Sequence, residues 1–372
     1  MQRVGKTSFR IVKDCIFLQR ATRALGVNMN NQSVSLYDEQ YGWRRCLDVR
    51  SRALIHTSSA PKKKKRQQQQ RPASSSAPSA ANSYFSDDCE PLLFDVDCNL
   101  THADMEKDIE EHIKGAKDSG ICGMIVPGST VEESRTCIEI AKTYGSGPFV
   151  VKTTVGVHPY HAGGWGGEEI RQMKEMIMNT TGIVAAVGEC GLDYSDGFPD
   201  RSLQLPVFEE QVKLSCELKL PLFLHQRGAF DDFVRVMECY RPNENGINVL
   251  VHCFTGDQRE IDWILSQKNY FLSFSGIICK DGRGDGLRSV LAGVGRDELK
   301  HKIMVETDAP YLGFPGCRSA CASKKKRQYP NVPSALPRVV DELAKCLGVP
   351  EDEKRVFARE LTNTARSFFS CV

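Results

Sequence analysis

The chain has 372 residues, and its net charge of +2 conceals two oppositely charged segments. Residues 1–86 carry 16 Lys and Arg residues against four acidic ones, whereas the remainder carries 33 basic and 43 acidic residues. This length exceeds the usual size of one hydrophobic core, so we expect one large domain with an appendage. The acidic body does not attract a polyanion by net charge, so nucleic-acid binding there requires a metal ion or a local basic patch.

Apolar runs and cysteines narrow the class of protein further. No apolar run reaches ~18 residues, so the sequence predicts no membrane-spanning helix and no membrane partner. The 15 cysteines form no CxxC pair, which favours reduced thiols over a disulfide framework. Cys98, Cys190 and Cys253 each lie beside a polar residue at a strand end, and side-chain alternation predicts that they pack outward against helices.

Residues 1–88 are predicted to be a basic, largely disordered leader and linker. Six basic residues lie between Arg3 and Arg23 against a single acid, a pattern typical of a mitochondrial presequence; an ordinary basic tail is the alternative. Residues 61–82 read PKKKKRQQQQRPASSSAPSAAN and have almost nothing to bury. Within them, Lys62 to Arg66 form a nuclear import signal, a nucleic-acid tether or a solvated linker. A mitochondrial location is therefore predicted, with cytoplasm or nucleus as alternatives.

From residue 89 to residue 372, apolar runs alternate with amphipathic segments. Eight runs have the character of β-strands, and their starts lie 23 to 39 residues apart, which accommodates a strand, a helix and two loops. Eight such units fit a (β/α)8 TIM barrel of about 250 residues. A doubly wound open sheet is the alternative, because periodicity does not show closure. The predicted strands are 92–97, 121–126, 149–157, 183–189, 222–225, 247–252, 270–275 and 302–306.

Helical periodicity appears between these strands. The segment 131–144 follows Thr130, whose hydroxyl is suited to an N-cap. The predicted helices are 105–117, 131–144, 203–218, 257–266, a segment around Glu298, 339–347 and 352–368.

Four short apolar runs each end in a residue that can bind a metal. These residues are Glu189, His225, His252 and Asp308. The carboxyl ends of parallel barrel strands share one rim, so the four side chains are expected to converge there. Carboxylate and imidazole are the ligands of hydrolytic sites that use Mg²⁺, Mn²⁺ or Zn²⁺. Gly188 and Gly191 flank the glutamate, which suits a sharp turn and a close approach.

The motifs GECGLDY, LPLFLHQR, VHCFTG and VETDAPYL, with VGVHPYHA upstream, resemble those of the TatD family of metal-dependent deoxyribonucleases. The resemblance extends from about residue 92 to residue 368. It implies a (β/α)8 barrel that hydrolyses DNA phosphodiester bonds with one or two divalent cations, typically Mg²⁺, as a 3′–5′ exonuclease in DNA repair or DNA degradation. Carried over by motif, Glu189, His225, His252 and Asp308 are metal ligands. Glu189 and Asp308 are also expected to be catalytic, with Asp308 orienting or deprotonating the attacking water.

The first strand departs from the family pattern. Many members have Asp-x-His-x-His there, whereas this chain reads FDVDCNLTH and places Asp97 and Asn99 where the histidines stand. Both residues offer oxygen, which favours a hard ion such as Mg²⁺ over Zn²⁺. An Asn-Leu-Thr strand also occurs in one branch of the family that resembles active nucleases. Activity is therefore expected, with altered occupancy of the first metal position.

Further residues are expected to support the site. His158 ends the third strand and is a candidate for contact with a metal, a phosphate or a water. Asp193 is predicted to position a metal ligand or a loop, and Arg227 to bind phosphate through its guanidinium. A basic cluster in the loop after the last strand is predicted to bind the DNA backbone, with a solvated charge run as the alternative; it consists of Lys324, Lys325, Lys326 and Arg327.

Two other functions remain open at this point. The same barrel could hydrolyse a small ester, an amide or an aminoacyl-tRNA bond, because fold does not fix chemistry. The missing strand-1 histidines would also fit a non-catalytic DNA-binding barrel. The sequence indicates DNA as a substrate and identifies no protein partner.

Overall fold

The structure, a computed structural model, describes residues 34–38, 43–47, 92–318 and 330–371. The chain divides into two units, Met1–Ser74 and Ser75–Val372. The first unit contains an antiparallel hairpin of β1 (Val34–Asp38) and β2 (Trp43–Leu47), which the sequence did not predict. The proposed presequence, the Lys62 to Arg66 cluster and the boundary at residue 88 lie outside the described residues and stay predictions.

The second unit contains one parallel sheet of eight strands in the order β10-β9-β8-β7-β6-β5-β4-β3. Each strand pairs with its neighbour in sequence, which is the strand order of a singly wound βα barrel. All eight predicted strands are confirmed. They are β3 (Leu93–Asp95), β4 (Ile121–Val126), β5 (Val150–Val155), β6 (Val184–Asp193), β7 (Leu222–Arg227), β8 (Val249–Val251), β9 (Tyr270–Phe274) and β10 (Ile303–Val305).

Backbone hydrogen bonds just beyond the ends of β3 and β10 close the sheet into a barrel. Val96 N donates to Val305 O (3.2 Å), and Asp308 N donates to Asp97 O (2.9 Å). Cys98 and Ala309 then form a parallel bridge. The predicted TIM barrel is thus confirmed over the open-sheet alternative. Closure also brings the segments that follow the first and last strands together at the rim.

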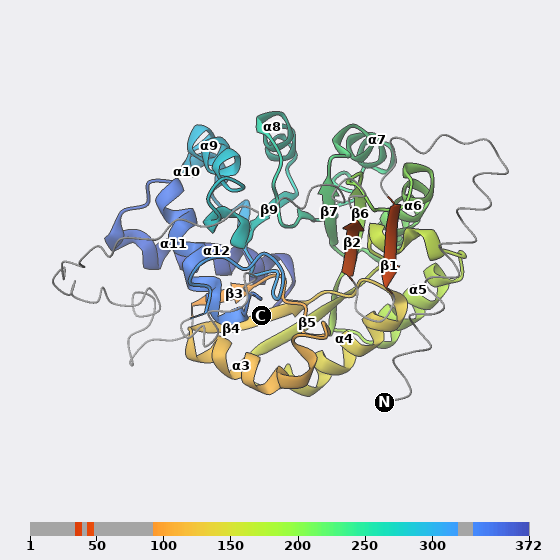
Figure 1. Cartoon of the computed structure of the whole chain (residues 1–372), viewed down its shortest axis with the longest axis horizontal. Helices are drawn as coiled ribbons and strands as arrows, with labels where there is room; N and C mark the ends of the chain where they lie inside the picture. Colours follow the sequence, from red (N-terminus) through yellow and green to blue (C-terminus); the bar gives the residue numbers. More distant parts are fainter. Residues whose placement is uncertain (1–33, 39–42, 48–91, 319–329, 372) are drawn as a thin grey trace, which may run out of the picture. The chain divides into compact units, whose positions relative to one another are not determined.

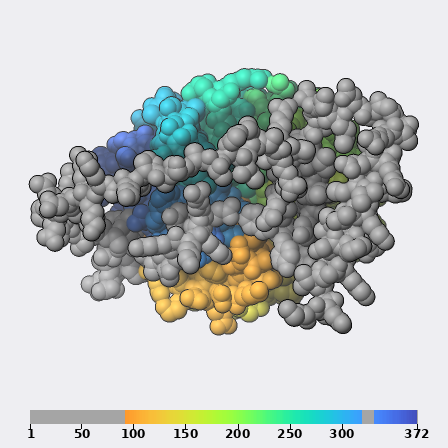
Figure 2. Space-filling model, in the orientation of Figure 1, coloured from red at the N-terminus to blue at the C-terminus, as the bar shows by residue number. Residues whose placement is uncertain are grey.

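Helices surround the sheet in chain order (Figure 1). In the space-filling view, the orange segment near α3 and the teal segment near α8 lie on opposite sides of the visible face (Figure 2). The helices are α3 (Ile109–Asp118), α4 (Val131–Tyr144), α5 (Glu169–Asn179), α6 (Arg201–Leu218), α7 (Phe230–Tyr240), α8 (Gln258–Ser266), α9 (Asp285–Val294), α10 (Arg296–Leu299), α11 (Leu336–Cys346) and α12 (Lys354–Phe368). Short 3₁₀ turns are η1 (Glu106–Asp108), η2 (Pro159–Gly164), η3 (Gly276–Cys279), η4 (Pro333–Ala335) and η5 (Glu351–Glu353).

Local chemistry accounts for where several helices begin. The Thr130 hydroxyl accepts a hydrogen bond from Glu133 N at the start of α4, as predicted, and Asp257 caps α8 in the same way. The sequence analysis did not predict α5 and α7, although both bury an apolar face. Among the described residues, no helix combines the length and apolar character needed to cross a bilayer.

Two apolar layers hold the barrel together. The larger lies between the strands and the surrounding helices. The smaller fills the barrel interior with side chains such as Phe94, Phe223 and Leu250, and it includes Phe368 and Phe369 from the end of α12. The Phe223 ring stacks on the His252 ring, with centroids 4.7 Å apart and planes inclined by 26°. The packed interior therefore supports a polar side chain at the rim.

Candidate active site

Glu189 is placed by an irregularity in β6. The register with β7 shifts between Val187 and Cys190, and a bulge of this kind re-aims a side chain. Gly188 and Gly191 have positive φ angles of 149° and 137°, and a Cβ at Gly191 would lie 1.9 Å from His225 O. Glycine is therefore required for β6 to approach β7 on both sides of the glutamate, as the sequence suggested.

One carboxylate oxygen of Glu189 faces three imidazole rings. Its Oε1 lies 2.8 Å from His252 Nε2, 3.2 Å from His158 Nε2 and 3.4 Å from His225 Nδ1. Burial raises the pKa of Glu189, but His158 and His252 lower it more, so the pKa lies well below its usual value. Burial lowers the pKa of His158. His158, Glu189 and His225 each offer an atom that could bind one metal ion, and these atoms lie within 4.8 Å of one another.

Asp193 holds His225 from the opposite side of the ring. Its Oδ2 lies 2.9 Å from His225 Nε2, and its Oδ1 accepts a hydrogen bond from Ser195 N at 2.8 Å. Burial lowers the pKa of His225, whereas Asp193 and Glu189 raise it more, and the net pKa is raised. Asp193 thus directs Nδ1 of His225 toward Glu189, which is the positioning contact predicted for it.

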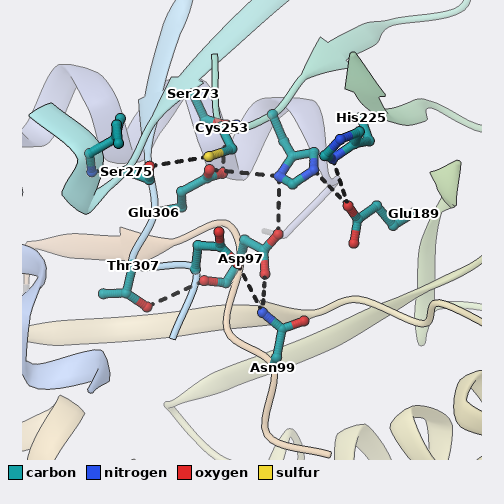
Figure 3. A network of polar contacts seen from close by, with 12 residues as sticks. Asp97, Asn99, Glu189, His225, Cys253, Ser273, Ser275, Glu306 and Thr307 are labelled. Carbon is teal, nitrogen blue, oxygen red and sulfur yellow. Dashed lines mark hydrogen bonds and ion pairs between the residues drawn. The ribbon is translucent and has the colours of Figure 1, made fainter. Parts of the chain in front are cut away.

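A second group of potential ligands consists of Asp97, His252 and Glu306, and Figure 3 shows the side chains of Asp97 and Glu306. His252 Nδ1 is 3.1 Å from Asp97 Oδ2 and 3.6 Å from Glu306 Oε1. All three residues are buried. Among the described residues, none of these three atoms has a hydrogen-bond partner: the contact with Asp97 is not aligned as a hydrogen bond, and the contact with Glu306 is too long for one. Buried polar atoms without partners are costly, so their convergence suits a cation.

The charges of this group are strongly coupled. Burial raises the pKa of Asp97 well above its usual value, and His252 offsets the effect only in part. Burial also lowers the pKa of His252, but Glu189 and Asp97 raise it more, so that it lies well above normal. Several carboxylates are buried here beside a single imidazole, so their negative charges are only partly balanced. Such a site favours the binding of additional positive charge.

Asp308 and Asn99 complete the rim. Asp308 has a φ of 53°, a left-handed conformation that Asp tolerates better than most residues. Asn99 Nδ2 donates to Asp308 Oδ1 (3.1 Å) and to Asp97 Oδ1 (3.2 Å), and Figure 3 shows this amide next to Asp97. Burial, followed by the charge of Glu306, raises the pKa of Asp308 to about 8. The Asn of strand 1 therefore links two carboxylates.

The structure brings the four strand-end residues and Asp97, Asn99, His158 and Asp193 into one cluster. Arg227 lies at the end of β7 with an exposed side chain, and its backbone oxygen accepts from Tyr194 N. The cluster Lys324 to Arg327 lies outside the described residues, so its role in DNA binding stays a prediction.

The prediction for one of the three cysteines was wrong. Cys98 and Cys190 are buried in the apolar layer, as expected. Cys253, however, lies beyond the end of β8 with a φ of 47°, and its Sγ is 3.2 Å from Ser275 Oγ. The strand has already ended at Val251, so side-chain alternation no longer governs this residue.

Sequence reasoning missed Glu306 as a potential ligand. The predicted strand 302–306 ends in Glu306 itself, the same strand-end position that singled out Glu189. That position was the available signal. Glu306 is also held by Ser273, whose hydroxyl donates to Oε2 at 2.6 Å. Nearby, Thr307 donates to buried Asp95 through both its backbone N and its hydroxyl.

A barrel whose strand ends gather carboxylates and imidazoles is typical of hydrolytic enzymes. A family model described as "TatD related DNase" matches residues 94–370. The chain belongs to this family, and it is thus a hydrolase of the nuclease class.

Curated proteins of similar sequence align with this chain over almost their whole length. A protein of Erwinia tasmaniensis named "3'-5' ssDNA/RNA exonuclease TatD" is 32% identical over 276 residues, covering 74% of this chain and 99% of the relative. A protein of the same name from Erwinia billingiae is 33% identical, covering 74% and 98%.

Solved structures share the fold. A TatD homologue from Escherichia coli superimposes with a TM-score of 0.64 at 23% identity, covering 75% of this chain and 98% of the other. A TatD family hydrolase from Entamoeba histolytica gives 0.65 at 21% identity, with coverages of 75% and 98%. At these identities the likeness shows the fold alone.

Proposed function

We propose that the protein is a divalent-metal-dependent deoxyribonuclease that hydrolyses DNA phosphodiester bonds from the 3′ end, with a role in DNA repair or DNA degradation. The observation that carries the metal dependence is the convergence of three buried polar atoms without hydrogen-bond partners on Asp97, His252 and Glu306. The relatives named as 3′–5′ exonucleases support the reaction and its polarity.

The residues present fit one or two divalent ions. Glu189, His225, His252 and Asp308 are the proposed ligands, and His158 faces the same carboxylate oxygen. The oxygens of Asp97 and Glu306 extend the ligand set on the Nδ1 side of His252. Carboxylate oxygens favour Mg²⁺ or Mn²⁺, whereas imidazoles also suit Zn²⁺; Mg²⁺ is the proposed ion. A bound divalent cation would polarise the phosphate and stabilise the charge that develops on its oxygens.

Asp308 is the proposed proton acceptor. A general base must lie within reach of the proton that it takes, and Asp308 lies at the rim beside the proposed metal ligands, where it interacts electrostatically with Glu189 and His252. The Asn99 amide fixes one carboxylate oxygen, which leaves the other to receive the proton of a water molecule. Arg227, exposed at the end of β7, is proposed to bind the phosphate oxygens of the substrate.

The test uses the full chain and single-stranded DNA labelled at its 5′ end. Wild type is incubated with Mg²⁺, Mn²⁺ or Zn²⁺, or with EDTA, and progressive shortening is expected only with a divalent ion. Glu189→Gln removes the charge that faces three imidazoles and should reduce cleavage by at least about 100-fold. Glu217→Gln is the matched control, because Glu217 is an exposed residue of α6 paired with Lys174.

Two results would contradict the proposal. One is an absence of cleavage by wild type with all three ions, which would favour a non-catalytic barrel. The other is cleavage by Glu189→Gln at the wild-type rate. A parallel assay on a panel of small esters and amides separates nuclease activity from the other hydrolase functions.

A further inference from the structure

Beside the proposed metal ligands, a row of aromatic rings leads from Glu189 to the surface. The row consists of His225, His158, Phe198 and Tyr160. The Phe198 ring is inclined by only 19° to the His225 ring, with centroids 6.4 Å apart, and lies 6.0 Å from His158. The edge of Tyr160 meets Phe198 at 5.5 Å and 84°. Tyr160 is 37% exposed, so the row reaches solvent.

Phe198 and Tyr160 lie outside the apolar core of the barrel. Within the described part of the chain, neither ring belongs to the two apolar layers or packs against them. Tyr160 lies in η2, directly after the end of β5, and Phe198 in the loop that follows β6. Both loops leave the carboxyl ends of strands, where barrel enzymes bind their substrates. Aromatic side chains in such places typically contact a ligand.

Hydrogen bonds from the backbone nitrogens fix the positions of both residues. Tyr160 N donates to His158 Nδ1 at 3.2 Å, and this contact ties the tyrosine to the residue that faces Glu189. Phe198 N donates to Ser195 O at 3.2 Å, and Ser195 N donates to Asp193. Both contacts are made by backbone nitrogens, so they place the two residues beside the site and persist when a side chain is shortened.

We propose that Phe198 and Tyr160 form a stacking platform for an unpaired base next to the phosphodiester bond that is cleaved. This inference rests on the proposed nuclease function and adds a means of recognising single strands. Nucleic-acid bases stack on aromatic rings with little regard to sequence. A base inside a duplex uses both faces for stacking, and a paired terminal base must leave its partner and its neighbour before it can stack on the platform, so unpaired ends are favoured. The acidic barrel gains affinity in this way without relying on long-range attraction.

The first arm of the test uses variants of Phe198. Phe198→Ala should raise the KM for a single-stranded oligonucleotide about tenfold. Phe198→Trp should retain the wild-type KM, because tryptophan also offers an aromatic face. Phe198→Leu should raise the KM as Phe198→Ala does, because leucine fills much of the volume but has no aromatic face. The kcat for methyl p-nitrophenyl phosphate should be unchanged in all of them. Met178→Ala, an exposed apolar site on α5, is the control and should behave as wild type.

A second readout separates stacking from phosphate contact. Loss of a phosphate contact reduces the dependence of affinity on salt, whereas loss of a stacked base does not. The KM of Phe198→Ala should therefore rise by the same factor at low and at high salt. A reduced salt slope would overturn the stacking role.

The third arm changes the substrate and needs no variant. Two oligonucleotides carry an abasic nucleotide at the terminal or the penultimate 3′ position. With wild type, at least one of them should show the tenfold rise in KM, and Phe198→Ala should add nothing further on that substrate. The platform is refuted when both abasic substrates bind like intact DNA, or when Phe198→Ala and Tyr160→Ala both retain the wild-type KM. Failure of wild type to cleave any oligonucleotide would instead refute the proposed nuclease function.

Discussion

His252 Nδ1 lies 3.1 Å from Asp97 Oδ2, yet the two atoms are not aligned as a hydrogen bond. The other ring nitrogen, Nε2, lies 2.8 Å from Glu189. One imidazole therefore stands between two groups of potential ligands. Asp97 supplies a carboxylate to the second group.

Asp97→Asn is expected to separate stability from metal binding. Burial raises the pKa of Asp97, so the neutral amide should leave the metal-free protein at least as stable as wild type at pH 7. The gain in Tm on adding Mg²⁺ should shrink, because a ligand charge is lost. A saturating ion at 100 times its Kd stabilises by about 2.7 kcal/mol. Thermal melting with EDTA and with a series of Mg²⁺ concentrations measures both effects.

The control for this experiment is Asp118→Asn, an exposed residue at the end of α3. The rise in Tm that Mg²⁺ causes in Asp118→Asn should equal the rise in wild type. An undiminished gain in Asp97→Asn would show that Asp97 does not contribute to ion binding.

Asp193→Asn should weaken the site through His225. The carboxylate lies 2.9 Å from Nε2 of that ring. Replacing a residue that holds a metal ligand in this way typically lowers the metal affinity by about 10–100-fold. We expect the metal concentration for half-maximal cleavage to rise by this factor, while the rate at saturating metal falls much less. Asp196→Asn, an exposed residue in the same loop, should leave the metal titration unchanged. A loss of rate that no metal concentration restores would contradict the positioning role.

The sequence predicted the barrel because eight apolar runs recur at the spacing of βα units, and backbone physics alone sets that spacing. It placed Glu189, His225, His252 and Asp308 correctly at one rim because parallel strands share their direction. The contacts between the residues of the site could not be predicted from the sequence in the same way. Whether His158 faces Glu189, and how Asn99 joins Asp97 to Asp308, depends on the bulge in β6 and on barrel closure, which join residues far apart in sequence.

The failures have local causes. Glu306 was not predicted as a ligand, although the predicted strand 302–306 ends at this residue. The outward direction expected for Cys253 was wrong because the strand ends at Val251 and the φ of Cys253 is positive. Phe198 was not considered, because a single aromatic residue in a loop carries no periodic signal.

The stability of the metal-free protein should depend on pH through Asp308. Its pKa is about 8 in the folded state, against a usual value of 3.8. Between these values the folded state binds more protons than the unfolded state, so the free energy of unfolding falls as pH rises. Asp308→Asn removes this contribution. With EDTA present, the Tm of the variant should exceed that of wild type by a margin that grows between pH 5 and pH 8, by at least about 2–4 °C, which is about 1 kcal/mol for a domain of this size.

His252, in Coulombic contact with Asp308, acts in the same direction, because its raised pKa stabilises the fold below 6.5 and this stabilisation is lost at higher pH. Because the two groups interact, Asp308→Asn also lowers the pKa of His252, so the change in pH dependence belongs to the pair. A Tm difference that stays constant from pH 5 to pH 8 would show that Asp308 is not a protonated carboxyl group in the metal-free fold.

A final prediction concerns the glycine that lets β6 approach β7. A Cβ at position 191 would lie 1.9 Å from His225 O, and the φ of 137° is strained for any other residue. Gly191→Ala should therefore displace His225 or unfold the barrel, with a loss of stability of several kcal/mol, roughly in the range of severe core substitutions, and a loss of cleavage. Gly286→Ala is the matched control, because that glycine lies in α9 with open space around it, and alanine there should keep or slightly raise the Tm. Urea denaturation of both variants gives the comparison. Wild-type stability together with wild-type activity in Gly191→Ala would mean that the close contact between these strands is not needed to position the site.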